Sequence, residues 1–387
     1  MQCCLNSIIE PYSEKVYGEH KYEVLTSSRE GLQRQVDHFG SEQRHDTDGY
    51  NVIPFGYCTY RNRSDDGRFA FNINTISSNA IVSKFYPVFR FTNANSLFMS
   101  EFLNSSSRAK KKLSVLAVGT SQVVLSFEAL KAADFDLPCK DEQDKIASFF
   151  ECLNRRIEYQ RTLVDALKKY KRGLSSSLFD EISKSGCPTV SFADGFRLLQ
   201  NNTFSRDDLS YDVGDVRNIH YGDVLIKYGT VTDIGALSVP CIKPDRDIEK
   251  FSSSSYLRNG DIVFADTAED YTVGKATEIV GVTNQRVLSG LHTIPCRPHD
   301  RFAPMFLGHY FNSYHFRRQI YRMIQGIKVS SISKSEIAKT TILTPPYDVQ
   351  RKVASVLSEV DHLIEKEAET VIVLQKIRRG LLQQLFI

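Results

Sequence analysis

The side chains best suited to holding a ligand are basic residues set among aromatic ones in the last quarter of the sequence. Between Arg301 and Thr340, seven lysines and arginines stand against a single acid, Glu336, and seven phenylalanines and tyrosines lie among them. Cationic groups on a helix that packs on an aromatic core are typical of proteins that contact nucleic-acid phosphates. The segment therefore predicts a nucleic-acid surface, with a solvated basic face as the alternative. Its predicted contacts are Arg317, Arg318, Arg322, Lys328 and Ser330.

A second basic run precedes a small loop in the first half of the chain. Gly119-Thr120-Ser121 follows the run 108–112, as Gly326-Ile327-Lys328 follows the other basic segment. Such a loop can present backbone N–H and hydroxyl groups to phosphates or bases. The same pattern in both halves favours binding over a merely solvated face. The predicted contacts of this part are Arg108, Lys110, Lys111, Lys112, Thr120 and Ser121.

A third candidate is Tyr60-Arg61-Asn62-Arg63, with Arg68 close behind it. Arginine and asparagine have the donor and acceptor patterns that read guanine and adenine edges. Turns also collect these residues, so a structural turn stays open as the alternative. Arg61 and Arg63 are the predicted contacts with DNA bases.

No motif in the sequence predicts catalysis. Thr344-Pro345-Pro346-Tyr347 is similar to the Asp/Asn-Pro-Pro-Tyr loop with which adenine methyltransferases hold a flipped base. The equivalent place in the first half reads Leu137-Pro138-Cys139-Lys140, and no Gly-rich cofactor loop precedes it, so the prolines fit a structural role before a helix. Phosphate-binding loops and Ser-His-Asp arrangements are also missing from the sequence. We therefore expect no catalytic residues.

Composition limits the class of protein. The 387 residues suit two domains, and 41% hydrophobic and 25% charged residues are usual for a soluble protein. The net charge of +3 does not by itself indicate a nucleic-acid partner, because the distribution of charge matters more than its sum. The eight cysteines include no Cys-x-x-Cys pair, and no apolar run is long enough to span a membrane. We expect a cytoplasmic protein with no bound metal and no membrane partner.

The elements that must position these side chains come from an internal repeat. Residues 137–179 align without a gap on 344–386, and the weaker match upstream places Gly119 over Gly326. A repeat of this length predicts two duplicated modules, each a domain followed by a helix. The identical pairs include Pro138/Pro345, Gln143/Gln350, Ala147/Ala354, Ile157/Ile364, Leu167/Leu374, Gly173/Gly380 and Phe179/Phe386.

Each repeated segment predicts one long helix of roughly 60 Å. Its apolar residues recur at spacings of four and three, which is typical of a coiled-coil seam, although amphipathic helices packed on a core remain the alternative. Polar residues interrupt the seam at matching places, Gln160 and Lys171 in the first copy and Glu367 and Arg378 in the second. Gly173 and Gly380 predict a close approach or a break. The seam residues are Ile146, Phe150, Leu153, Ile157, Val164 and Leu167 in the first copy, and Val353, Leu357, Val360, Ile364, Val371 and Leu374 in the second.

The stretches before each helix predict independent α+β domains. Val52–Tyr60, Tyr221–Ile226 and Asn259–Phe264 are expected to hold buried strands, and short helices are expected at 96–112 and 304–324. The predicted fold class is α+β: two mixed α/β domains separated by two long helices in an antiparallel coiled coil, with a pseudo-two-fold axis between the halves.

Both predicted helices open and close on the same motif. They begin at Asp141-Glu142-Gln143 and Asp348-Val349-Gln350, and they end in Gly-Leu-x-x-x-Leu-Phe at 173–179 and 380–386. With two dissimilar domains between the helices, nearly the whole chain resembles the specificity subunit of type I restriction-modification enzymes. One departure is the opening up to about Lys21, which has no clear equivalent at 180–200.

The resemblance implies two target-recognition domains, 1–136 and 182–343, that each read one half of a bipartite site in double-stranded DNA. It implies that the helices, 137–181 and 344–387, act as a spacer and dock two methyltransferase (modification) subunits, which motor-nuclease (restriction) subunits join. S-adenosylmethionine, ATP and Mg²⁺ then belong to those partners, and this chain is expected to be a non-catalytic subunit with no cofactor. A coiled-coil assembly scaffold that does not bind DNA is the alternative.

Overall fold

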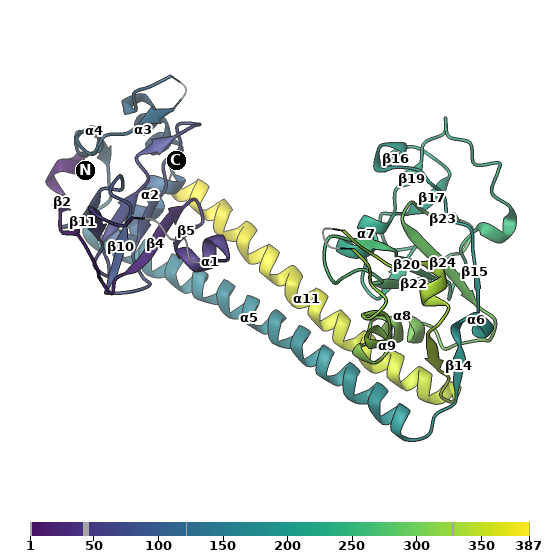
Figure 1. Ribbon diagram of the computed structural model, residues 1–387. Helices are drawn as coiled ribbons and strands as arrows, with labels where there is room; N and C mark the ends of the chain where they lie inside the picture. Colours follow the sequence, from purple (N-terminus) through teal and green to yellow (C-terminus); the bar gives the residue numbers. More distant parts are fainter. Residues whose placement is uncertain (1, 42–45, 121, 327–328, 387) are drawn as a thin grey trace. The chain divides into compact units, whose positions relative to one another are not determined.

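Figure 1 shows the computed structural model of the chain, which describes residues 2–41, 46–120, 122–326 and 329–386. The chain divides into two compact units, Met1–Arg161 with Glu369–Ile387, and Thr162–Ala368. Each unit holds one mixed α/β domain and a part of each of two long helices, α5 (Lys140–Lys184) and α11 (Tyr347–Leu385). The predicted mixed α/β class with two long helices is confirmed.

The domain of the first unit is built on two sheets of short strands. Its core sheet has the order β2-β11-β7-β9 with antiparallel neighbours throughout, and its second sheet has the order β3-β6-β10-β4-β5. Two pairs, β1 with β13 and β8 with β12, complete it. The bounds are β1 Gln2–Cys4, β2 Ile9–Tyr12, β3 Lys15–Val16, β4 Glu23–Ser28, β5 Gly31–Arg34, β6 Tyr50–Val52, β7 Cys58–Tyr60, β8 Arg63–Ser64, β9 Phe71–Ile73, β10 Ala80–Val82, β11 Val88–Phe91, β12 Val123–Val124 and β13 Asp134–Asp136.

Helices of this domain pack on the core sheet through aromatic side chains. Asn95, Ser106 and Ser126 start three of them, since each side chain accepts a backbone N–H three residues ahead, which is the usual N-cap bond. Phe89 of the sheet and Phe98 of the following helix belong to one buried cluster. The helices are α1 Gln35–Phe39, α2 Ser96–Ser105, α3 Ser107–Leu116 and α4 Phe127–Lys131, and a 3-10 turn spans Leu5–Ser7.

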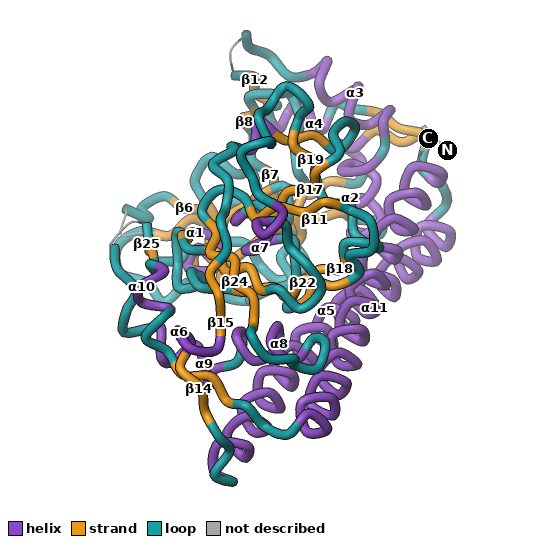
Figure 2. The backbone as a smooth tube through the Cα atoms, turned by 90° about the vertical axis from the view of Figure 1, so that its right-hand side faces the viewer, coloured by secondary structure: helices purple, strands orange, loops and turns teal. Residues whose placement is uncertain are grey.

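The domain of the second unit repeats this plan with longer strands. Its core sheet has the order β15-β24-β20-β22-β18, and a second sheet has the order β16-β19-β17-β23. Figure 2 labels β15, β24 and β22 of the core sheet and β17 and β19 of the second sheet. Phe264, Phe306 and Phe311 lie at the centre of its core. The strands are β14 Thr189–Ser191, β15 Phe196–Leu198, β16 Leu209–Ser210, β17 Val216–Ile219, β18 Val231–Asp233, β19 Cys241–Ile242, β20 Ile262–Ala265, β21 Thr267–Ala268, β22 Ala276–Val280, β23 Arg286–Ser289, β24 Thr293–Pro298, β25 Ser330–Ser331 and β26 Thr341–Leu343; the helices are α6 Phe192–Gly195, α7 Tyr221–Ile226, α8 Phe306–Asn312, α9 Tyr314–Ile320 and α10 Lys334–Ile337.

One expected strand is a helix. The prediction for Asn259–Phe264 is confirmed by β20, but Tyr221–Ile226 forms α7. The ring nitrogen Nδ1 of His220 accepts the N–H of Gly222 at 3.2 Å and so caps a helical turn. Ile226 is 90% exposed, so the run is not a buried strand.

The duplication reaches the opening of the chain, contrary to the sequence-based expectation. β1 pairs with β13 as β14 pairs with β26, with Gln2 opposite Asp136 and Thr189 opposite Leu343. β2 and β15 then follow and pair with β11 and β24. The equivalence is hidden in the sequence because this part lies at an offset of 187 residues rather than 207, since the second domain is longer.

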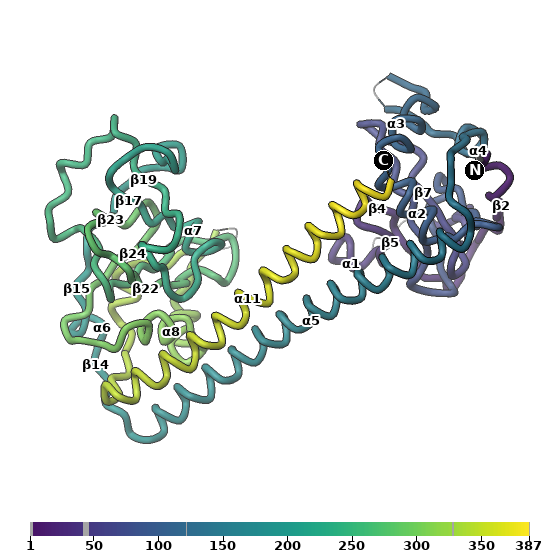
Figure 3. Tube along the Cα trace, turned by 180° about the vertical axis from the view of Figure 1, so that it is seen from behind, coloured from purple at the N-terminus to yellow at the C-terminus, as the bar shows by residue number. Residues whose placement is uncertain are grey.

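In each unit the two long helices run antiparallel (Figures 1 and 3). In the first unit Arg378 Nε donates to Asn154 Oδ1 at 2.6 Å, and the rings of Phe386 and Phe150 stack 6.3 Å apart. In the second unit Lys171 Nζ lies 2.5 Å from a carboxylate oxygen of Asp361. Lys171 and Arg378 are the equivalent polar interruptions of the predicted seam, and each bonds across to the equivalent position of the other helix.

Most of the predicted seam is covered. Phe150, Ile157, Val164, Val353, Leu357 and Val360 are buried, and Ile146, Leu153, Leu167, Ile364, Val371 and Leu374 are half-buried. The glycines do not mark a break or a close approach: Gly173 and Gly380 lie inside α5 and α11, and no heavy atom lies within 4 Å of a Cβ built on either.

Among the described residues, no helix combines the length and the apolar character that a membrane span requires.

Candidate nucleic-acid interface

Four arginines converge on a small cavity in the first domain. The cavity has a volume of about 110 Å³, and three serines line it together with the arginines. Its arginines come from the turn after β4, from the segment between β7 and β8, from β8 itself and from the loop after β8, so tertiary folding assembles it from separate segments. We call Arg29, Arg61, Arg63 and Arg68 the arginine cup.

The four arginines differ in their partners. Arg29 donates to Asp66 at 2.7 Å, and Arg68 lies 3.9 Å from the same carboxylate. Hydrogen bonds from Ser64 and from the Arg68 backbone, together with Arg29, lower the pKa of Asp66, so it stays ionised. Arg61 and Arg63 form no ion pair within the described part of the chain, and the Arg63 guanidinium lies over the Phe85 ring at 5.2 Å. These two exposed side chains have donors left for a ligand.

The structure brings the predicted loop to the arginine cup. β12 pairs with β8, so that Val124 lies opposite Arg63, and Leu125 N donates to Asn62 O at 2.9 Å. Gly119 turns the chain with φ +138°, where a Cβ would lie 2.2 Å from a backbone oxygen. Thr120, which is exposed, follows it, and Ser121 lies outside the described residues.

The basic run of α3 divides between two sides of the helix. Ser114 lies beside Gly67 in the loop of the arginine cup, since a Cβ on Gly67 would be 3.1 Å from its Oγ. Lys110 and Lys111 stand four and three residues before Ser114 and therefore share that side of the helix, and both are exposed.

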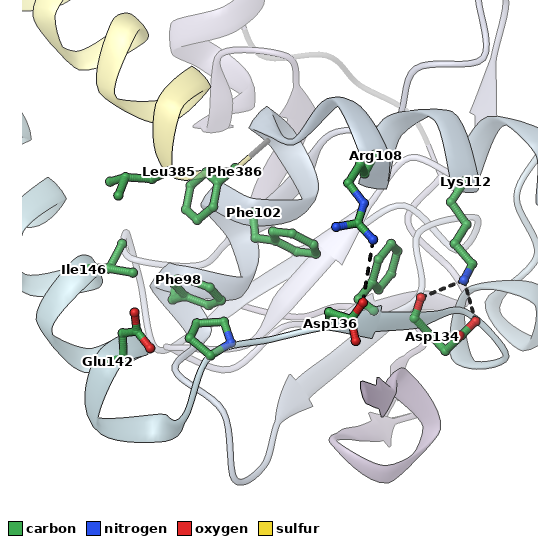
Figure 4. A pocket seen from close by; sticks show the side chains of 12 residues that line it. Phe98, Phe102, Arg108, Lys112, Asp134, Asp136, Glu142, Ile146, Leu385 and Phe386 are labelled. Carbon is green, nitrogen blue, oxygen red and sulfur yellow. Dashed lines mark hydrogen bonds and ion pairs between the residues drawn. The ribbon is translucent and has the colours of Figure 1, made fainter. Parts of the chain in front are cut away.

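Arg108 and Lys112 point away from the arginine cup. Arg108 lies 3.6 Å from Asp136, and Lys112 Nζ donates to the Asp134 carbonyl at 2.7 Å. Both line a different cavity of about 340 Å³, beside Phe386 (Figure 4). Their ion pairs tie α3 to β13, so the structure does not place them with the other predicted contacts.

The arrangement in the second domain is different. Arg317 is only 9% exposed, and its Nη2 donates to the carbonyls of Tyr271 at 2.6 Å and Val273 at 3.0 Å. It therefore holds the backbone of the segment 270–274, rather than standing free on the surface as the sequence-based prediction assumed. Tyr271, at the tip of this segment, is 80% exposed.

The remaining predicted contacts of the second domain lie on its surface. Arg318 and Arg322 are exposed, on α9 and just after it, and Ser330 is half-buried in β25, which pairs with β21. Gly326 turns the chain with φ +109°, as Gly119 does in the first domain. Lys328 lies outside the described residues.

Sequence reasoning missed Arg29 and the serines of the arginine cup. Asn72 Nδ2 donates to Ser27 Oγ and to Ser28 O, each at 2.8 Å, and so holds the end of β4 beside the segment that carries Arg61. Local sequence holds no signal for this contact. No group of three or more His, Cys, Asp or Glu side chains within the described ranges could hold a metal ion.

Sequence comparison relates the first part of the chain to a known domain. Residues 11–169 match the sequence profile of the type I restriction modification DNA specificity domain. This match covers the first part of the chain and less than half of its length. A curated relative, the MjaX type I restriction enzyme specificity subunit of Methanocaldococcus jannaschii, is 26% identical over 198 residues. That match covers 50% of this chain and 42% of the relative, so the chain spans less than half of that protein's length.

Solved structures share the fold of this chain. A type I restriction-modification S subunit from M. genitalium aligns over 100% of this chain and 96% of its own, with a TM-score of 0.54 and 13% identity. A chain from a structural study of complex assembly and conformational transition in the type I system covers 100% and 97%, with a TM-score of 0.57 and 16% identity. At such identities the likeness shows the fold alone.

Proposed function

We propose that this chain is the DNA-reading subunit of a type I restriction-modification complex, and that each of its two domains recognises one part of a bipartite site in double-stranded DNA. The observation that carries the proposal is the match of residues 11–169 to a DNA specificity domain, whose order of elements is repeated in the second unit. An assembly scaffold without DNA binding fits less well, because it gives no role to Arg61 and Arg63, which have no carboxylate partner among the described residues.

In the proposed reading of DNA, Arg61 and Arg63 contact base edges, since a guanidinium can donate two hydrogen bonds to guanine. Lys110, Lys111 and Thr120 contact phosphates beside them, which positions the domain without specifying sequence. In the second domain Arg318, Arg322 and Ser330 are the proposed counterparts, and the proposed domain bounds are 1–136 and 182–343.

The proposed roles of the long helices, 137–181 and 344–387, are to set the gap between the two half-sites and to dock two methyltransferase subunits. Support comes from an exposed apolar face on α11 in the first unit, where Ile372, Val373 and Ile377 are about half exposed. Motor-nuclease subunits would join that assembly. S-adenosylmethionine, ATP and Mg²⁺ would act on the partners, and we propose a non-catalytic role in the cytoplasm for this chain.

The test is to co-express the chain with the neighbouring methyltransferase gene and to map modified adenines across the host genome. We expect one split motif with a fixed gap. A contiguous motif, or modification that does not depend on this chain, would contradict the proposal.

A further inference from the structure

A groove in the second unit is lined by α5, by α8 and α9, and by the segment 270–275. Two adjoining cavities of about 280 and 540 Å³ form it and share five residues. All lining residues belong to the second unit, so the groove is a feature of one compact body. The shared residues are Lys171, Thr230, Asn312, Arg317 and Tyr321.

The lining of the groove carries more positive than negative charge. No acid lines the smaller cavity, which Lys171, Arg172 and Arg317 line. Two acids, Asp270 and Asp361, line the larger cavity, and Asp361 forms an ion pair with Lys171. Lys275 donates only to carbonyls, those of Leu225 and Tyr228 at 2.9 and 3.0 Å. Within the described part of the chain, neither Arg172, Lys275 nor Arg317 forms an ion pair.

The pKa values of Lys275 and His309 reflect this excess of positive charge. Burial lowers the pKa of Lys275, and the charges of Arg317 and Lys171 lower it further. Burial also lowers the pKa of His309 to about 4, and Lys171 adds to the shift. Both cationic forms are disfavoured by neighbouring positive charge, which an anion in the groove would offset.

The walls of the groove offer further donors and flat surfaces. Tyr314 and Tyr321 line the smaller cavity and are 60% and 41% exposed, and Tyr271 of the larger cavity is 80% exposed. Arg172 is exposed on α5 and has no hydrogen-bond partner among the described residues. Arg172 lines the same cavity as Tyr314 and Tyr321, and guanidinium and hydroxyl groups are usual donors to phosphate oxygens.

We propose that this groove binds a phosphate group through Arg172, and that in the assembled complex the phosphate is one of the DNA backbone beside the half-site of the second domain. The DNA form of the inference rests on the proposed function. The same chemistry would accept inorganic phosphate or a free nucleotide, so the test includes both sources.

The internal repeat supplies a matched control. Arg379 on α11 is the repeat equivalent of Arg172, and it is also exposed. The cavity beside the helices in the first unit has about 370 Å³ and is lined by Glu30, Glu101 and Glu151 without any lysine or arginine. The proposal therefore predicts different effects from the same substitution at equivalent positions.

The experiment compares R172Q and R379Q in the full chain, with DNA affinity measured against salt concentration on a duplex that carries the target site and on a random duplex. For R172Q we expect an equal loss of affinity on both duplexes and a reduction of about 1 in the slope of log affinity against log salt, as for one lost phosphate contact. R379Q should behave as wild type. Equal melting temperatures would show that both variants fold.

Titration with inorganic phosphate and ATP, followed as a shift in melting temperature, separates the sources. If phosphate or ATP raises the melting temperature of the wild type but not that of R172Q, and R172Q binds DNA as well as the wild type, the ligand of the groove is a free phosphate. That result would stand even if the wild-type chain showed no sequence preference on DNA. A lack of sequence preference would defeat only the proposed function. If R172Q and R379Q behave alike in every assay, the groove has no special role and the inference is overturned.

Discussion

The arginines of the arginine cup differ in whether another side chain of the described chain binds them. Asp66 holds Arg29 and contacts Arg68, whereas Arg61 and Arg63 have no carboxylate partner within the described ranges. The sequence identifies Arg61 and Arg63 because arginine and asparagine alternate there. It cannot identify Arg29, or the burial of Arg317, because contacts with distant segments decide both.

Substitution of Arg63 by lysine tests the reading role. R63K keeps the positive charge but loses the paired donors of the guanidinium. We expect the preference for the target duplex over a random one to fall by about 1–3 kcal/mol, with affinity for random DNA almost unchanged. Competition binding measures both. The control R155K, at an exposed arginine on α5, should change neither, and an equal loss on both duplexes would contradict base reading.

His309 gives the second unit a predictable response to pH. Its pKa falls from 6.5 to about 4 on folding, mainly through burial, so the unfolded chain binds the proton more tightly. Its contribution to stability is present above pH 6.5 and is lost as pH falls towards 4. Between pH 7.5 and 5 we expect the wild type to lose about 2 kcal/mol more unfolding free energy than H309Q.

Urea unfolding followed by circular dichroism measures this difference, since the chain has no tryptophan. Glutamine can keep hydrogen bonds to Thr230 and Ser358, which lie 3.3 and 3.0 Å from the ring nitrogens. Parallel pH curves for wild type and H309Q would show that His309 is not shifted as described.

Among the elements, the sequence predicts the long helices well and the small ones unevenly. The helices α5 and α11 follow a pattern that repeats over some forty residues, and local periodicity is enough to define it. For 221–226 the local pattern suits a strand, but the segment forms the helix α7. His220 caps its first turn, and Ile226 is exposed to solvent and not buried as in a core strand. The equivalence of β1 and β14 escapes detection because the two domains differ in length.

Gly119 determines the course of the loop after α3. A Cβ on Gly119 would lie 2.2 Å from the Gln122 carbonyl oxygen, at a φ that L-residues rarely adopt. We expect G119A to distort the loop beside the arginine cup, to weaken DNA binding at least tenfold and to cost about 1–3 kcal/mol of stability. Binding assays and thermal melting check the two effects.

Gly173 is the matched position for that experiment. It lies inside α5 with no heavy atom within 4 Å of a built Cβ, so G173A should stabilise the chain by up to about 1 kcal/mol and leave DNA affinity unchanged. A G119A variant that binds DNA as well as G173A would show that the loop takes no part in binding.

For the molecule as a whole, the two duplicated domains share a framework and differ at the position of the arginine cup. Gln143 and Gln350 both bind a proline carbonyl and a backbone N–H of their own domain, at 2.8 to 3.0 Å. At the arginine cup, however, the paired strand β8 begins with Arg63, whereas its counterpart β21 is Thr267–Ala268. Two domains with one framework and different surfaces should read two different half-sites, so the target is expected to be asymmetric.

We propose that the helices set the gap between the two half-sites, and lengthening both helices tests this proposal. A copy of 157–163 is inserted after residue 163 and a copy of 364–370 after residue 370, and modified adenines are mapped with the methyltransferase partner present. Seven residues add roughly 10 Å of helix, or about three base pairs of DNA. We expect unchanged half-motifs with a gap longer by about three base pairs, whereas an unchanged gap or altered half-motifs would contradict a spacer role for the helices.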